Sequence, residues 1–156
     1  MQNKSKKLIV ANWKMKPQTL SEGKKIITGI SKAAAAAKRV DTVVCPPAIF
    51  LSELKRHYKG KKIVFGGQNA FWEPVGSYTG KTSPAMLADM KAKYIIIGHS
   101  ERRALGETNE QVNQKIHAAL AAGLKVILCF GEAKRDRSGD YLVFLYKQLK
   151  TALSGI

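Results

Sequence analysis

One stretch of the sequence concentrates polar side chains directly after an apolar run. Tyr94-Ile95-Ile96-Ile97 is short and rich in β-branched residues, which is typical of a strand buried on both faces. Gly98 ends the run, and His99-Ser100-Glu101-Arg102-Arg103 then bring an imidazole, a hydroxyl, a carboxylate and two guanidinium groups. So many polar groups cannot lie in a core, and polar groups after a buried parallel strand are typical of an α/β active site.

His99 is the residue of this stretch best suited to acid–base chemistry. Ser100 is predicted to cap a short helix that begins at Glu101, and this places His99 beside the positive end of that helix. We expect a neutral ring there, able to donate a hydrogen bond. The alternative is a histidine that only satisfies the loop backbone while the arginines are solvated. The crowding of polar groups favours the catalytic interpretation.

Alternation of strands and helices should position these groups. Strands are predicted over residues 7–11, 41–45, 62–69, 94–97 and 125–130. The range 62–69 includes the polar residues that end the third strand. Helices are predicted over residues 20–37, 48–58, 84–90, a short turn from 101, 109–122 and 141–153. This alternation implies a parallel sheet with right-handed crossovers, either doubly wound or part of a (β/α)₈ barrel. No glycine-rich fingerprint follows the first strand, and polar residues end strands one, three, four and five, so the barrel is favoured.

Composition bounds the class of protein. The chain has 156 residues, 45% apolar and 24% charged, which fits one globular domain. We find no long apolar span and no secretion leader, and therefore expect a cytoplasmic location. Cys45 and Cys129 lie inside apolar runs without metal-ligand spacing, so both are predicted to be buried thiols in a reducing compartment.

The formal net charge of +16 is unusual. It raises nucleic-acid binding as a first idea, but the 27 basic residues are dispersed and no RNA-binding or helix-turn-helix pattern is present. A positive field also attracts a small anionic substrate. Charge alone leaves these interpretations open, and the motifs do not favour nucleic acid.

Two motifs resemble signatures of the triosephosphate isomerase family. They are Asn12-Trp13-Lys14-Met15 after the first strand and the segment 96–103 after the fourth. Gln68-Asn69, Tyr78-Thr79-Gly80 and Cys129-Phe130-Gly131-Glu132 match the family in the same order. The resemblance covers nearly the whole chain but only the first five βα units of the barrel. It implies an α/β fold, a partial (β/α)₈ TIM barrel, with residues 1–156 as one incomplete domain.

The resemblance also implies an activity. The family is a homodimeric aldose–ketose isomerase of glycolysis and gluconeogenesis that interconverts dihydroxyacetone phosphate and D-glyceraldehyde 3-phosphate through an enediolate, without metal or other cofactor. By this resemblance Asn12 and Lys14 bind the phosphorylated triose, His99 is the neutral electrophile, and Glu101 helps to hold Lys14; the family is a well-known case of a neutral histidine beside a glutamate base. Structural or interface positions near the site would be Ser100, Gln68, Asn69, Thr79, Arg102 and Glu107.

Two departures from the family pattern matter. The family's catalytic glutamate, its closing loop and its glycine-rich phosphate grip belong to units beyond the five matched here, so we expect the 156 residues alone to be inactive. The alternative function is a non-catalytic half-barrel that binds anionic ligands or nucleic acid. Lys81 stands where the family usually has a glutamate that reaches across the dimer toward the position of Arg102. Two cations there would repel, which puts the usual dimer contact in doubt.

Overall fold

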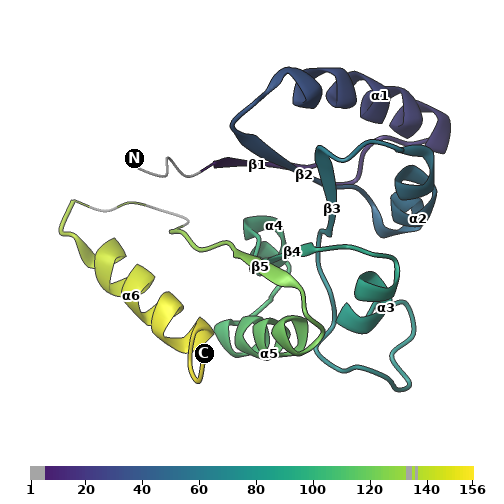
Figure 1. Ribbon diagram of the computed structural model, residues 1–156. Coiled ribbons are helices and arrows are strands. Elements are labelled where there is room, and N and C mark those ends of the chain that lie inside the picture. Colours follow the sequence, from purple (N-terminus) through teal and green to yellow (C-terminus); the bar gives the residue numbers. More distant parts are fainter. Residues whose placement is uncertain (1–5, 133–134, 136) are drawn as a thin grey trace.

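Five parallel strands form one curled sheet in the order β1-β2-β3-β4-β5 (Figure 1). The computed structural model describes residues 6–132, 135 and 137–156. The strands are β1 (Lys7–Asn12), β2 (Val40–Cys45), β3 (Ile63–Gly67), β4 (Tyr94–Ile97) and β5 (Lys125–Leu128). Each strand pairs in parallel with the next one in the sequence. The predicted partial barrel is confirmed, although β5 ends at Leu128 rather than at Phe130.

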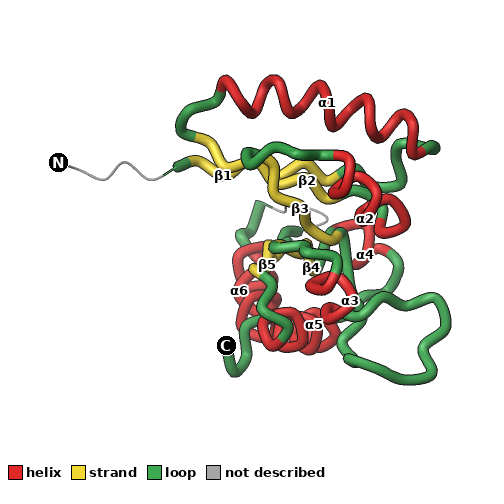
Figure 2. Tube along the Cα trace, turned by 45° about the vertical axis from the view of Figure 1, so that its right-hand side comes forward, coloured by secondary structure: helices red, strands yellow, loops and turns green. Residues whose placement is uncertain are grey.

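Helices cover the outer side of the sheet (Figure 2). They are α1 (Leu20–Ala36), α2 (Ala48–His57), α3 (Pro84–Asp89), α4 (Ser100–Ala104), α5 (Asn109–Ala121) and α6 (Asp140–Ala152). Side-chain caps at the first turn explain where some of these helices begin. The Thr19 hydroxyl accepts from the Glu22 amide at α1, and Thr108 and Gln111 form the predicted capping box at α5. Within the described residues, no helix has both the length and the apolar composition that crossing a membrane requires.

The buried core has two unequal parts. The larger part lies between the sheet and the helices and includes Val44, Phe65, Ile95 and Ile97. The smaller part comprises Val43, Cys45 and Ile96. Because successive side chains of a strand point to opposite faces, Val43 and Val44 fall into different parts. The smaller part therefore belongs to the concave face, which the curl of five strands covers only in part.

The two cysteines differ in exposure. Cys45 is fully buried, and its burial raises the pKa of the thiol to about 12. It is therefore an unreactive core residue, as predicted. Cys129 is only half-buried, because it follows the end of β5 beside a cavity. The prediction of two buried thiols is right for the first and wrong for the second.

Candidate active site

Side chains from the first and fourth strand ends meet at the carboxyl edge of the sheet. The Lys14 ammonium nitrogen lies 2.6 Å from Oε1 of Glu101. Three strand spacings of about 4.8 Å, roughly 14 Å in all, would separate β1 from β4 in a flat sheet. The curl of the sheet brings the two ends within reach of one lysine side chain. Both side chains remain more than half exposed, so a ligand can approach them.

The backbone of Lys14 adopts a conformation that is rare for a non-glycine residue. Its φ is +55°, and such strain costs about 1–3 kcal/mol unless neighbouring groups enforce it. Two side chains do so. Oδ1 of Asn12 accepts a hydrogen bond from the Lys14 amide at 3.0 Å, and Nε2 of Gln68 donates to the Lys14 carbonyl at 2.9 Å. The same Gln68 nitrogen also donates to the Cys45 carbonyl at 2.9 Å, which ties the ends of β1, β2 and β3 together.

His99 is the N-cap of α4, and the prediction that Ser100 fills this role is wrong. Helix α4 begins at Ser100, so the residue before it is the cap, and Nδ1 of His99 accepts the Glu101 amide at 3.2 Å. A ring nitrogen that accepts a hydrogen bond carries no proton, so the proton of the neutral ring lies on Nε2. Oε2 of Glu101 is 3.7 Å from Nδ1, too far for a competing hydrogen bond. Ser100 itself is exposed.

Arg103 is a structural residue, whereas the sequence placed it among the polar groups of the site without a role of its own. Its Nε donates to the Gly98 carbonyl at 2.8 Å, and its Nη1 donates to Oδ1 of Asn109 at 2.6 Å. Its Nη2 donates to the Cys129 carbonyl at 3.3 Å. One guanidinium thus joins the ends of β4 and β5 to the start of α5. Partial burial lowers the pKa of Arg103, but a guanidinium stays charged at any ordinary pH.

A second buried group of polar side chains lies behind the site. The Glu107 carboxylate makes a close ion pair with the Lys115 ammonium, and both side chains are at least 96% buried. Lys115 also donates to Oδ1 of Asn69 at 2.9 Å, and Nε of Arg102 lies 3.6 Å from Oε1 of Glu107. Asn69, Arg102 and Glu107, which were predicted to be structural or interface residues, therefore lie in one group, and their roles stay predictions. Lys115 was missed.

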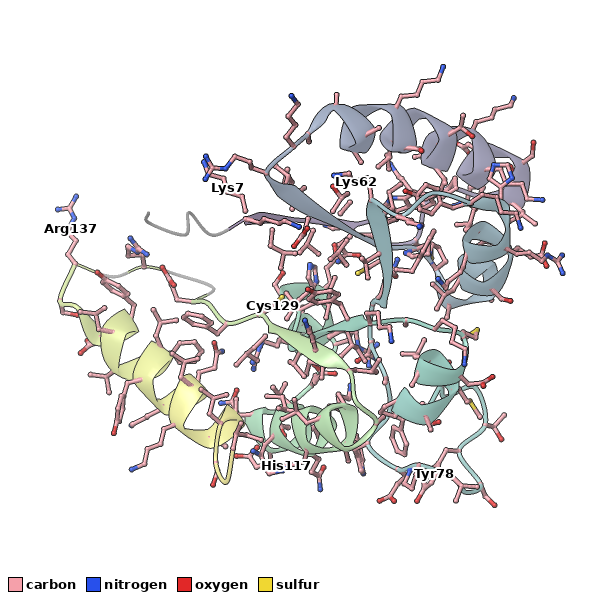
Figure 3. The ribbon with its side chains drawn as sticks, viewed as in Figure 1. Lys7, Lys62, Tyr78, His117, Cys129 and Arg137 are labelled. Atoms are coloured by element: carbon pink, nitrogen blue, oxygen red, sulfur yellow. The ribbon has the colours of Figure 1, made fainter. Side chains whose placement is uncertain are left out.

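Thr79 lies apart from the other predicted site residues. It is exposed in the loop 70–82, which projects from the sheet, and Figure 3 marks this loop by the neighbouring Tyr78. Figure 3 also labels Cys129, which follows β5 near the strand ends. Within the described residues, no hydrogen bond joins Thr79 to Lys14 or His99. The structure brings Asn12, Lys14, Gln68, His99 and Glu101 together, with Ser100 next to His99 in the chain. Asn69, Arg102 and Glu107 belong to the separate buried group, and Thr79 belongs to neither.

A cavity of about 700 Å³ lies beside His99 on the side of β5. Its walls include His99, Arg103, Cys129, Glu132 and Phe144. Glu132 lies 2.6 Å from the Arg135 guanidinium. A hydrogen bond with its own backbone, and then Arg135, lower the pKa of Glu132. The Lys14 side chain similarly lowers the pKa of Glu101. Both carboxylates are therefore stabilised as anions and are weakened as proton acceptors.

Comparison with known proteins agrees with this geometry. The family model described as triosephosphate isomerase matches residues 7–156. The chain belongs to the triosephosphate isomerase family. It is 42% identical over 151 residues to the triosephosphate isomerase of Thermoanaerobacter pseudethanolicus, with 96% of this chain and 60% of that protein covered. It is 44% identical to the triosephosphate isomerase of Dehalococcoides mccartyi, with 96% and 59% covered.

The fold of this chain also matches a solved structure of the family. The triosephosphate isomerase of Bartonella henselae superposes with a TM-score of 0.82 at 36% identity, covering 97% of this chain and 63% of that one. The chain thus spans about 60% of the length of the curated triosephosphate isomerases it matches, and the matched part is their N-terminal portion. The site described above lies within that portion.

Proposed function

We propose that this chain supplies the electrophilic half of a triosephosphate isomerase active site. The observation that carries the proposal is the meeting of Lys14, Glu101 and His99 at the carboxyl ends of β1 and β4. In a (β/α) barrel, this is the face where active sites lie. A cation and a neutral imidazole donor side by side suit a substrate with an anionic group and a carbonyl.

Each residue has a distinct part in the proposed reaction. Lys14 neutralises the substrate's negative charge, and Asn12 holds the Lys14 backbone while it hydrogen-bonds the triose. Nε2–H of His99 donates to the carbonyl oxygen of dihydroxyacetone phosphate. A base removes a proton from C1, and the electron pair moves through the new C1–C2 double bond onto that oxygen. The ring then transfers a proton between the two oxygens, and the base returns its proton to C2.

The described carboxylates at and behind the site do not suit the role of the base. Proton abstraction beside a carbonyl needs a carboxylate that can accept a proton. Glu101 is paired with Lys14, Glu132 is paired with Arg135, and Glu107 is buried against Lys115. The units that the curated relatives have beyond the matched portion are the proposed source of the base. Residues 1–156 are then one incomplete domain, which alone does not catalyse the reaction.

Assembly, cofactor and location follow from the family with one exception. The proposed enzyme needs no metal or other cofactor and is cytoplasmic. The family's homodimer is not carried over unchanged. Lys81 stands where the family usually has a glutamate that reaches across the dimer toward the position of Arg102, and two cations there would repel, so this dimer contact is proposed to be absent.

Replacing Lys14 with methionine tests the proposed substrate site. The chain joined to the part of the Thermoanaerobacter protein beyond the matched segment is hereafter the completed chain. In it, Lys14→Met should abolish measurable binding of a phosphorylated carboxylate analogue of the enediolate, because the cation at the end of β1 is lost. The pKa of Glu101 should also rise toward its ordinary value of 4.5. Calorimetry measures the first effect, and carbon-detected NMR titration of the carboxyl group measures the second.

The sign of the titration follows from the ion pair. Lys14 lowers the folded-state pKa of Glu101, so the stabilising contact is complete above about pH 4.5 and is lost as the pH falls through the lowered pKa. Lys25→Met, which removes an exposed charge from α1, is the control and should change neither readout. Analogue affinity and a Glu101 titration like those of the parent would contradict the assigned role of Lys14.

A further inference from the structure

A group of cations lies at the amino ends of the strands, the edge of the sheet opposite to the candidate active site. The segments that lead into the five strands, with the first residues of the strands, are here called the amino-end rim; they are residues 6–7, 37–41, 58–62, 89–93 and 122–125. These segments contain ten lysine and arginine residues, and all ten are exposed. Because parallel strands begin at the same edge of a sheet, cations that are dispersed along the sequence are gathered on one face of the molecule.

Backbone contacts between neighbouring strands make the rim continuous. The Lys7 amide donates to the Arg39 carbonyl at 3.1 Å, so these residues lie side by side at the starts of β1 and β2. The Lys125 amide donates to the Lys93 carbonyl at 2.9 Å, which joins the starts of β4 and β5 in the same way. The sheet order places β3 between these two pairs, and Lys62 directly precedes β3. Figure 3 labels Lys7 and Lys62 on this rim. The basic residues therefore form one arc across all five strands.

Few negative charges oppose these cations. The rim contains two carboxylates, Asp41 and Asp89, and Oδ1 of Asp41 lies 3.4 Å from the Lys6 ammonium. Helices α1, α2, α3 and α5 end at the rim, and the C-terminus of each is equivalent to at most about half a negative charge. Carboxylates and helix ends together supply about four negative charges against ten positive ones. Compensation of the helix ends therefore explains only part of this charge, and about six positive charges remain.

The length of the arc suits an extended polyanion better than a small anion, which could contact only a few of the cations at once. Four strand spacings of about 4.8 Å give the arc a length of about 19 Å. A DNA duplex of that length carries about eleven phosphates, and about half of them face one side. About five phosphates would therefore meet about six uncompensated cations, so the two charge densities match.

The side chains of the rim indicate which polyanion it fits. None of these described segments exposes a large apolar side chain, so the rim has nothing to insert into a lipid bilayer. Their one aromatic residue, Tyr58, is half-buried, and its hydroxyl accepts from the Lys62 and Ile63 amides, so it is not a platform for unpaired bases. We propose that the amino-end rim binds the phosphate backbone of double-stranded nucleic acid, without reading its sequence. Lys14 and His99 lie at the opposite edge of the sheet, so this binding is independent of the proposed isomerase activity.

Fluorescence anisotropy of a short labelled DNA duplex, titrated with the 156-residue chain at several salt concentrations, tests the proposal. The dissociation constant should be about 10⁻⁴–10⁻⁶ M near physiological salt and the same for duplexes of different sequence. Contact with about five phosphates should give a slope of about −4 to −5 in a plot of the logarithm of the association constant against that of the salt concentration. An RNA duplex in a second titration distinguishes the two sources of such a backbone, and binding of either duplex with these properties supports the proposal.

Two double variants with the same change in net charge locate the binding surface. Lys62→Gln with Lys93→Gln removes two exposed rim cations, and should lower the duplex affinity at least about tenfold and the size of the slope by about 2. Lys25→Gln with Lys81→Gln removes exposed cations from α1 and the loop 70–82, away from the rim, and should leave both nearly unchanged. Circular dichroism of each variant checks the fold.

Equal losses of affinity in the two double variants would show that total charge, rather than the rim, holds the duplex, and would overturn the proposal. The absence of saturable binding, or an affinity that depends on the duplex sequence, would also overturn it. Tighter binding to vesicles of phosphatidylcholine and phosphatidylserine, or to single strands, than to either duplex would assign the rim to another polyanion and contradict the proposal as well.

Discussion

Replacing His99 with glutamine in the completed chain is expected to lower kcat by about 10²–10⁴-fold, the usual contribution of one positioned proton donor or acceptor. Affinity for the enediolate analogue should change far less than kcat, because the ring acts mainly on charge that develops in the transition state. Glutamine keeps a donor of similar reach but cannot pass a proton between the two substrate oxygens. Steady-state kinetics and calorimetry on the same samples measure the two effects.

His57→Gln is the matched control for this experiment. His57 is exposed at the end of α2, and its ring lies 3.4 Å from the Thr28 hydroxyl rather than at the strand ends. This variant should retain the parent's kcat and analogue affinity. A fall in analogue affinity as large as the fall in kcat for His99→Gln would contradict the account, because it would assign the ring to ground-state binding.

Removing one member of the buried Glu107–Lys115 pair should produce the largest stability loss. The two side chains are 2% and 4% exposed, so Glu107→Gln leaves an uncompensated ammonium in the core. Breaking a buried pair in this way costs about 3–5 kcal/mol of unfolding free energy. Urea unfolding of the completed chain, analysed by linear extrapolation, gives this quantity.

An exposed ion pair provides the control for this stability prediction. Glu53→Gln breaks a contact with Arg56, whose side chain is 74% exposed, and should cost no more than about 1 kcal/mol. The double variant Glu107→Leu with Lys115→Met should recover most of the loss, since apolar residues of similar size replace buried pairs well. A Glu107→Gln variant as stable as Glu53→Gln would contradict the structural role of the pair.

The sequence predicted the architecture because alternating apolar strands and amphipathic helices leave a strong local signal. The cap at α4 was predicted wrongly for a local reason. Serine is the commoner N-cap, and the sequence does not show that the helix starts one residue earlier, at Ser100, where an imidazole nitrogen accepts the amide. The end of β5 was also overestimated, because Cys129 and Phe130 are apolar but lie beyond the last paired residue.

The structural roles of Lys115 and Arg103 were not predicted, and only Lys115 left a sign of its role in the sequence. Lys115 stands in the buried stripe of α5 with Val112, Ile116 and Ala119, so a charge at an apolar position was a detectable sign of a buried pair. Arg103 had no such signal. Two of its partners are the backbone carbonyls of Gly98 and Cys129, and backbone acceptors leave no trace in the residue pattern.

The measurement that tests the central claim most directly is an isomerase assay on the 156-residue chain and on the completed chain, each purified from a host that lacks its own enzyme. The expected result is turnover by the completed chain and a rate about 10²–10⁴-fold lower for the 156 residues alone, because the carboxylates at the described strand ends, Glu101 and Glu132, are paired with cations and are poor bases. Comparable turnover by the 156 residues alone would contradict it. So would a folded, analogue-binding completed chain without turnover, the result expected of a non-catalytic half-barrel.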